Sequence, residues 1–212
     1  MNEKSLKIRK MVSIGVFSAL ELVLYYIRFP LPIFPSFLQV QFSMVPLLIC
    51  GFCYGYKASL VTLIIKTIIA SLISMGESMA IGEMADMVIG IIVLFVTTFI
   101  YKKNKTKKNA LISMIFGLLA WVISSALLNY FVLIPLYIKI YMKGNVDVFI
   151  GACSIIPGIN NDNYKIMYVL LGAIPFNLLL SFCVFTITFL TYKKVSKFLK
   201  YRNNSEYTNN ID

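Results

Sequence analysis

Long apolar segments, each bordered by polar or basic residues, constrain this chain more than any other feature. Of its 212 residues, 59% are hydrophobic, and the mean hydropathy is +0.81. A water-soluble domain of this size has no core large enough for that much apolar surface. The chain is therefore predicted to be an all-α integral membrane protein.

The length fits one compact bundle, because each transmembrane helix needs about 20 residues. We predict a single membrane domain over residues 1–212 with six transmembrane helices, at about residues 11–29, 43–55, 58–75, 80–101, 110–142 and 166–192. Three prolines between residues 30 and 35 predict a structured loop that ends near Gln41. The second helix is short enough to be re-entrant or tilted, and Pro135 is expected to kink the fifth.

The basic residues explain the net charge of +11 without a nucleic-acid partner. They cluster in three polar segments, at residues 4–10, 102–108 and 193–202, and each segment flanks an apolar run. The positive-inside rule places such segments in the cytoplasm. With six crossings, both termini also lie there, and the chain is predicted to be a multi-pass protein of the cell membrane.

Two asparagines lie inside apolar segments. Asn129 falls within the run 126–137, and Asn177 follows Pro175-Phe. An amide offers two donor hydrogens and two acceptor lone pairs, which suit an imide or a polyol ligand. The alternative is that each amide ties two helices together. Nearby aromatic residues could likewise stack on a ligand ring or fill the core: Phe37, Phe42, Tyr130 and Phe176.

Ionisable residues also interrupt the apolar runs, at Glu21, Lys66, Glu83 and Asp86. A Lys or Asp at mid-helix costs about 2.5–3.5 kcal/mol on insertion scales. Three interpretations stay open: a Lys66–carboxylate pair joining two helices, the lining of a solute pocket, or a proton relay. Glu83 and Asp86 lie one turn apart on one helix face, so a membrane enzyme using them as an acid/base pair is an alternative of a different class. The role of Glu21 is left open.

Small residues mark one face of the first helix. Gly15 and Ala19 have small-xxx-small spacing, with Ser18 beside them, and this spacing allows close helix approach in membranes. Internal packing and docking to another membrane protein both explain it.

Several motifs are missing from the sequence. It has no phosphate-binding loop of the G-x-x-x-x-G-K-[ST] type and no zinc-protease or nucleophile motif. The CxxC at Cys50 and Cys53 has no second pair and no histidine to complete a metal site. No catalytic residue, metal or cofactor is therefore expected. A passive carrier or one subunit of a larger machine fits best, while a purely structural protein would have no specific ligand.

An ordered set of motifs covers nearly the whole chain. It comprises Pro30-Leu-Pro32-Ile-Phe-Pro35-Ser-Phe-Leu38, Phe42-Ser43-x-Val-Pro46, Ile81-Gly-Glu83-Met-Ala85-x-x-x-Ile-Gly90, Asn129-Tyr-Phe-x-x-x-Pro135-Leu-Tyr137 and Ile174-Pro-Phe-Asn177-Leu-Leu. In this set the chain resembles the riboflavin-specific substrate-binding subunits (S components) of energy-coupling factor (ECF) transporters.

This resemblance implies a function. S components of this kind bind riboflavin from outside, as a transported ligand, and associate with a transmembrane coupling subunit and two cytosolic ATPases. They are thought to topple in the membrane to deliver the solute. The implied coupling surface comprises Gly15, Ser18 and Ala19, and the loop from Pro30 to Gln41 helps close the pocket. The implied substrate-binding residues are Asn129, Asn177, Phe37, Gln41, Lys66, Asp86 and Tyr130.

The chain departs from the family pattern at four positions. It has Gln41 where an Asp is usual, Thr67 where an Asn follows the lysine, Asp86 where an Asn is common, and Leu180 where a Lys is frequent. The change at Leu180 removes a charged donor from the expected pocket. An S component for another vitamin or a flavin-like solute is therefore the alternative within the same class.

Overall fold

The computed structural model describes residues 3–74 and 80–208, with side chains described for residues 7–74 and 80–197. Most of this part of the chain is helical. The elements in chain order are α1 (Glu3–Tyr26), β1 (Phe29–Pro30), β2 (Gln39–Val40), α2 (Met44–Tyr54), α3 (Tyr56–Ser74), α4 (Ile81–Lys103), α5 (Lys107–Leu128), the π-helical η1 (Asn129–Leu133), α6 (Ile134–Ile140), α7 (Val146–Ala152), α8 (Tyr164–Met167), the π-helical η2 (Tyr168–Ala173) and α9 (Ile174–Thr208). The loop predicted near residues 75–79 lies outside the described residues.

The short helix α2 forms the centre of the bundle. It packs against α1, α3, α4 and α9, and every residue from Met44 to Phe52 is buried. Its length explains this position, since 11 residues rise only about 16 Å. A second, smaller cluster of buried residues lies near α6, α7 and η2, around Phe149 and Tyr168.

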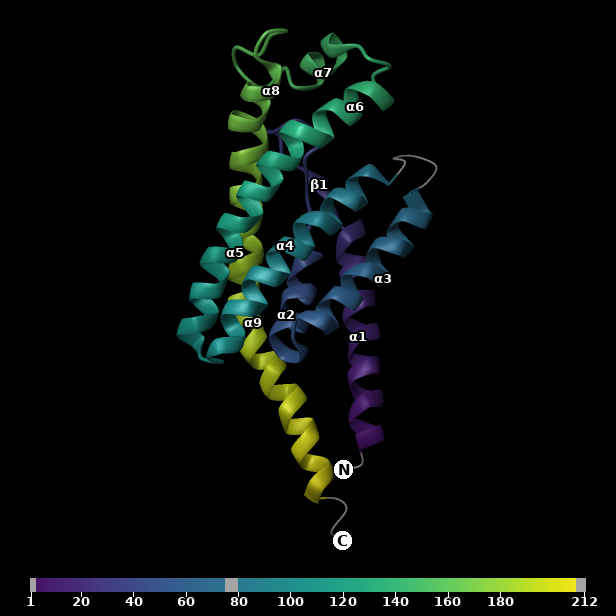
Figure 1. Ribbon diagram of the computed structural model, residues 1–212, viewed down its shortest axis with the longest axis vertical. Coiled ribbons are helices and arrows are strands. Elements are labelled where there is room, and N and C mark those ends of the chain that lie inside the picture. The colour runs from purple at the N-terminus through teal and green to yellow at the C-terminus, as the bar shows by residue number, and fades with distance from the viewer. Residues whose placement is uncertain (1–2, 75–79, 209–212) are drawn as a thin grey trace.

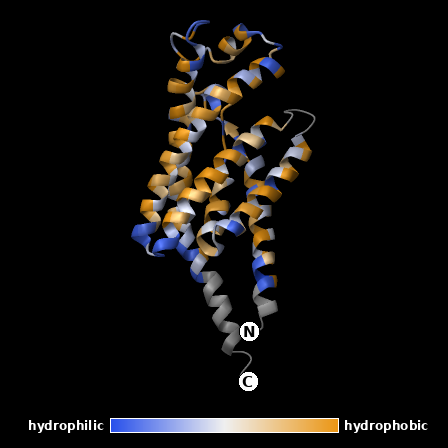
Figure 2. Cartoon of the chain, in the orientation of Figure 1, coloured by the Kyte–Doolittle hydropathy of each residue, from blue (hydrophilic) through white to orange (hydrophobic). Residues whose placement is uncertain are grey.

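Four helical segments in the described part of the chain are long and apolar enough to cross a membrane: Tyr56–Ser74, Ile81–Lys103, Lys107–Ile140 and Tyr164–Lys197. The start of α1, the α4–α5 turn and the end of α9 lie at one end of the molecule, and α6, α7 and α8 lie at the other (Figure 1). Hydrophilic residues gather at the α4–α5 turn and in the α6–α8 region, and hydrophobic residues cover the helices between them (Figure 2). This is the pattern of an all-α membrane protein.

Several helices begin or end away from their predicted positions. The first helix was expected to reach residue 29 but ends at Tyr26, because Pro30 disfavours helical geometry in the preceding residue and Phe29 pairs in a strand. The fifth begins at Lys107 rather than at 110, because the Thr106 side chain caps it by accepting a hydrogen bond from the Asn109 N–H at 3.2 Å. The predicted loop 143–165 contains α7, whose N-terminus is capped by Asn145.

Two π-helical segments replace the continuous helices that the sequence suggests. In η1 the N–H of Ile134 bonds to the carbonyl of Asn129, and in η2 the N–H of Ile174 bonds to the carbonyl of Val169. Each segment ends directly before an Ile-Pro pair. Proline has no N–H to continue an α-helical ladder, and a π-turn redistributes the bonds upstream of it. The kink expected at Pro135 therefore takes the form of a wide turn that starts at Asn129.

The proline-rich segment after α1 forms a small hairpin. β1 and β2 are antiparallel, with Phe29 opposite Val40 and Pro30 opposite Gln39. The loop between them packs by its aromatic rings: Phe34 lies 5.4 Å from Phe176 and Phe37 lies 5.8 Å from Tyr168, measured between ring centroids. The hairpin thereby covers the place where α9 and η2 meet.

Candidate ligand-binding cavity

A cavity of about 170 Å³ lies beneath the hairpin, and it receives side chains from α1 through α6, from both π-segments and from α9. Its lining divides into a charged part, supplied by α1, α3, α4 and the hairpin, and an amide part, supplied by α5, η1, η2 and α9. Such a mixture of apolar walls and a few convergent polar groups is typical of small-molecule sites.

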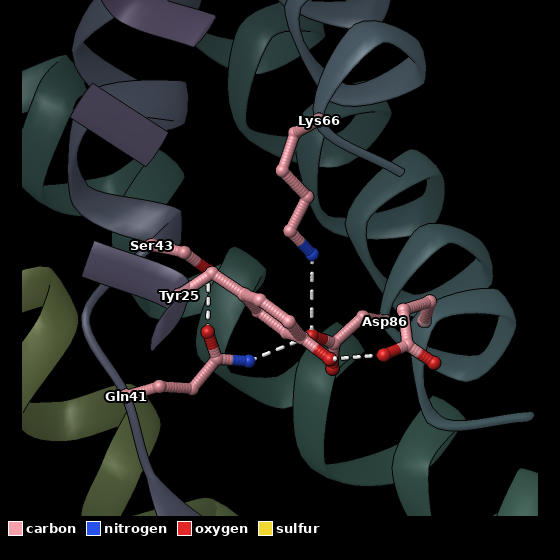
Figure 3. A network of polar contacts seen from close by, with 6 residues as sticks. Tyr25, Gln41, Ser43, Lys66 and Asp86 are labelled. Carbon is pink, nitrogen blue, oxygen red and sulfur yellow. Dashed lines mark hydrogen bonds and ion pairs between the residues drawn. The ribbon is translucent and has the colours of Figure 1, made fainter. Parts of the chain in front are cut away.

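The charged part centres on Asp86. Its Oδ2 accepts a hydrogen bond of 2.6 Å from Nε2 of Gln41 and lies 3.4 Å from Nζ of Lys66. Ser43 in turn donates to Oε1 of Gln41 at 2.7 Å. Figure 3 shows these side chains converging from the segment between β2 and α2, from α3 and from α4. Lys66 is only 1% exposed, so this pair offsets the cost of burying its charge, as one of the sequence interpretations anticipated.

Tyr25 connects the charged part to α1. Its hydroxyl donates to Oε1 of Glu83 at 2.9 Å, and its ring lies 4.1 Å from the ammonium of Lys66 (Figure 3). This is a cation–π contact in a largely desolvated place. Tyr25 thus bonds Glu83, whereas Gln41 and Lys66 contact Asp86, and of these two carboxylates Asp86 lines the cavity.

Glu21 also lines the cavity, from α1. The side chain is 1% exposed, and its Oε2 has no hydrogen-bond partner among the described residues. A buried polar atom of this kind is costly. Glu21 thus brings a carboxyl group with unused hydrogen-bonding capacity, within the described residues, to the cavity wall.

Asn129 and Asn177, predicted as the ligand-contacting amides, both line the cavity. Asn129 donates from Nδ2 to the Ser125 carbonyl at 2.8 Å, and its Oδ1 accepts from the Tyr168 hydroxyl at 3.2 Å. Asn177 has the same arrangement: Nδ2 donates to the Ala173 carbonyl at 2.8 Å, and Oδ1 accepts from Nε1 of Trp121 at 3.0 Å. Both amides therefore tie helices together, as one sequence interpretation expected, and both also line the cavity.

Each amide keeps hydrogen-bonding capacity beyond these contacts. An asparagine has two donor hydrogens and two acceptor lone pairs, and each amide uses one of each within the described residues. The Trp121 and Tyr168 donors also fix which way the amides point. The remaining donor and acceptor match a ligand edge with alternating N–H and C=O groups.

Of the other predicted site residues, the structure brings Phe37, Gln41, Lys66 and Asp86 to the cavity. It places Tyr130 elsewhere: the ring is half-buried, lies 4.9 Å from Phe131 and does not line the cavity. Leu180 is in the lining, one turn after Asn177, and leaves that wall apolar.

Sequence reasoning missed Trp121, Tyr137 and Tyr168, which also line the cavity. Aromatic residues in apolar helices are usually interpreted as residues of the hydrophobic core. The available signal was their polar tip: a buried indole N–H or phenol O–H needs a partner, and the intramembrane asparagines are the partners found for Trp121 and Tyr168.

The small residues of α1 point in two directions. Gly15 and Ala19 are exposed, and a Cβ added to Gly15 would meet nothing within 4 Å. Ser18 faces inward, is 5% exposed and donates to the Ile14 carbonyl at 2.9 Å. Exposed apolar residues, among them Met11, Val16 and Val23, continue the outer face.

A helical membrane bundle with a polar-lined cavity that is reached from α1 through α6, both π-segments and α9 is typical of a solute-binding membrane protein. The chain belongs to the family described as ECF transporter, substrate-specific component, whose sequence pattern matches residues 9–192. It is accordingly a multi-pass membrane protein and the substrate-binding part of a vitamin uptake system.

Relatives that cover more than nine-tenths of the chain are consistent with this assignment. The riboflavin transporter RibU of Staphylococcus aureus (strain TCH60) is 29% identical over 192 residues, which cover 91% of this chain and 93% of the relative. The riboflavin transporter FmnP of Bacillus subtilis (strain 168) is 26% identical over 203 residues, covering 94% and 98%. A solved S component of a bacterial ECF transporter superposes with a TM-score of 0.70 at 28% identity, covering 92% of this chain and 99% of that one.

Proposed function

We propose that this chain binds riboflavin in the cavity from outside and delivers it to the cytoplasm. The observation that carries this proposal is the convergence of Asn129 and Asn177, each oriented by an aromatic donor, on one cavity in a chain similar to riboflavin transporters. The imide edge of a flavin offers the N–H and C=O groups that the two amides can pair, and Phe37, Trp121 and Phe176 supply ring surfaces.

The cavity volume bears on how the ligand enters. About 170 Å³ is less than the roughly 300 Å³ at which drug-sized pockets begin. A fused three-ring ligand therefore requires the hairpin between Phe29 and Val40 to move outward, with Phe37 leaving Phe149 and Tyr168.

Titration of the purified protein with riboflavin tests this function, because flavin fluorescence is quenched on stacking against aromatic rings. Saturable quenching at one equivalent is the expected result. Absence of quenching with riboflavin, together with a thermal shift from a different vitamin, would instead identify the alternative solute to which Leu180, Gln41 and Asp86 are suited.

We further propose six membrane crossings with both termini in the cytoplasm. The support is that the start of α1, the α4–α5 turn and the end of α9 share one end of the molecule (Figure 1) and that basic segments border all three. A reporter fused after residue 212 that is active only in the cytoplasm tests this topology.

Transport by this chain would depend on partners, namely a transmembrane coupling subunit and two cytosolic ATPases. The sequence carries no phosphate-binding loop, and the exposed face of α1 with Gly15 and Ala19 offers a surface of small and apolar residues for a membrane partner. Because Ser18 faces inward, we place it outside this surface. Co-purification of the three partners with the tagged chain is the direct test.

A further inference from the structure

A second cavity, of about 550 Å³, lies at the end of the molecule that carries the α4–α5 turn. It is formed by the end of α2, the start of α3 and the last turns of α4, and it shares no lining residue with the ligand-binding cavity. Neither the family assignment nor the proposed riboflavin site uses it.

The charge of this cavity has one sign. Lysines from four separate segments line it: Lys10 of α1, Lys57 of α3, Lys102 of α4 and Lys105 of the following turn, whereas no Asp or Glu among the described side chains does. The first residues of α3, Tyr56 and Lys57, also line it, so the positive end of that helix dipole is directed to the same place. The cavity is suited to an anion.

An aromatic face continues from the cavity along α4. The ring of Tyr56 lies 5.9 Å from that of Phe95, and Phe95 stacks on Phe99 at 5.8 Å. Phe95 and Phe99 line the cavity and are 55% and 57% exposed. Phe95 is about two turns, or 12 Å, from the end of α4, which is one of the candidate membrane spans. The anion-binding end therefore joins a surface that faces hydrocarbon.

We propose that this cavity binds the phosphate-bearing headgroup of an anionic phospholipid, with the lysines around the phosphate and an acyl chain along Phe95 and Phe99. Basic pockets between transmembrane helices at the cytoplasmic side bind such headgroups. A free phosphate or a soluble acidic peptide would leave the exposed aromatic face without a role, and this favours the lipid.

Native mass spectrometry of the detergent-solubilised full chain with added dioleoyl phosphatidylglycerol tests the proposal. The test variant is Lys102→Gln/Lys105→Gln, and the control is Lys107→Gln/Lys108→Gln, which removes the same charge from the same basic segment but outside the cavity. Lipid affinity should fall by about fivefold for each lysine lost from the cavity and change by less than about twofold in the control.

Three outcomes would overturn the proposal. Equal losses in the two double variants would show that only diffuse charge attracts the lipid. Equal retention of dioleoyl phosphatidylcholine by the wild-type chain would show no preference for an anionic headgroup. Displacement of phosphatidylglycerol by millimolar inorganic phosphate in the wild-type chain would identify a soluble anion as the ligand. A Phe95→Ala/Phe99→Ala variant that weakens phosphatidylglycerol binding, with an unchanged melting temperature, would support the acyl-chain contact.

Discussion

Nε1 of Trp121 donates a 3.0 Å hydrogen bond to Oδ1 of Asn177, joining α5 to α9 within the cavity wall. The indole fixes the amide with its carbonyl toward α5. This orientation leaves the second N–H of Asn177 for a flavin carbonyl, so Trp121 and Asn177 are coupled in binding although, of these two residues, only Asn177 bonds the imide edge.

We therefore expect Asn177→Ala to weaken riboflavin binding by about 1–3 kcal/mol, because a buried ligand group loses its partner. Trp121→Phe keeps a ring but removes the donor, and should cost about 0.5–1.5 kcal/mol. The double variant should lose less than the sum of the two, as residues in one network do. Fluorescence titration measures all three.

Asn129→Ala is expected to weaken binding by a similar amount, about 1–3 kcal/mol, since its amide has the same arrangement with Tyr168. Asn109→Ala is a matched control: this amide also bonds a backbone carbonyl, that of Ile100 at 2.7 Å, but lies outside the cavity. Wild-type affinity in Asn129→Ala and Asn177→Ala, with lowered melting temperatures, would assign both amides to helix packing alone.

Removing either partner of the Lys66–Asp86 pair should destabilise the protein, and the loss of Asp86 should cost more than the loss of Lys66. Asp86→Asn leaves a lysine that is 1% exposed without its carboxylate and should lower the free energy of unfolding by about 3 kcal/mol. Lys66→Met should cost less, about 2 kcal/mol, because the Asp86 side chain is 33% exposed and keeps Gln41. Thermal unfolding in detergent measures which variant is less stable. Lys139→Met, at an exposed position, is the control and should change the free energy of unfolding by less than about 0.5 kcal/mol. The reverse order would mean that Asp86 carries the larger desolvation cost.

Docking through α1 predicts a separation of binding from transport. Gly15→Leu and Ala19→Leu place bulk on an exposed face, so riboflavin affinity of the isolated chain should stay within about twofold of wild type while cellular uptake is lost. Ala152→Leu adds the same bulk to an exposed position of α7 and should leave uptake intact. If both α1 variants take up riboflavin normally, the partner docks elsewhere.

Gly117 allows α4, α5 and α9 to approach closely. A Cβ at this position would clash with Cγ2 of Thr97 and lie 2.9 Å from Cζ of Phe185, so Gly117→Ala should destabilise the chain by about 1–3 kcal/mol. Gly15→Ala has open space and should instead stabilise it by about 0.5–1 kcal/mol, as alanine does in a helix. Opposite signs in thermal unfolding are the diagnostic result.

Cys153, beyond the candidate spans, is fully buried, and burial raises the pKa of its thiol to about 12. The folded state therefore favours the protonated form, and stability should fall as pH rises from about 8.5, the pKa of an unfolded thiol, toward 12. In a Cys50→Ala/Cys53→Ala/Cys183→Ala variant, maleimide should label Cys153 at pH 8 only after SDS unfolding. Rapid labelling of the folded chain would show that α7 opens.

The membrane class and the approximate positions of the long helices were predictable from the sequence. Apolar runs indicate helices that lie in hydrocarbon, and basic flanks indicate where those helices end. The sequence also indicated that Asn129 and Asn177 face the protein interior, because an asparagine within the membrane needs a hydrogen-bond partner. It did not predict η1 and η2, since their cause, the missing N–H of Pro135 and Pro175, acts several residues upstream. Nor did it distinguish Trp121 from core, or Tyr130 from a cavity residue, because a one-residue widening of the helix changes which side chains face inward.

The two wide turns also make the cavity wall sensitive to chain length. A π-turn holds one more residue than an α-turn, and each residue turns the helix by about 100°. Deleting a single residue between Asn129 and Pro135, or between Tyr168 and Pro175, would remove the extra residue of the π-turn. It would also rotate Asn129 relative to Tyr137, and Tyr168 relative to Asn177, by that angle. Substitutions at these positions would thus change only the groups that face the cavity, whereas an insertion or deletion would disassemble the site.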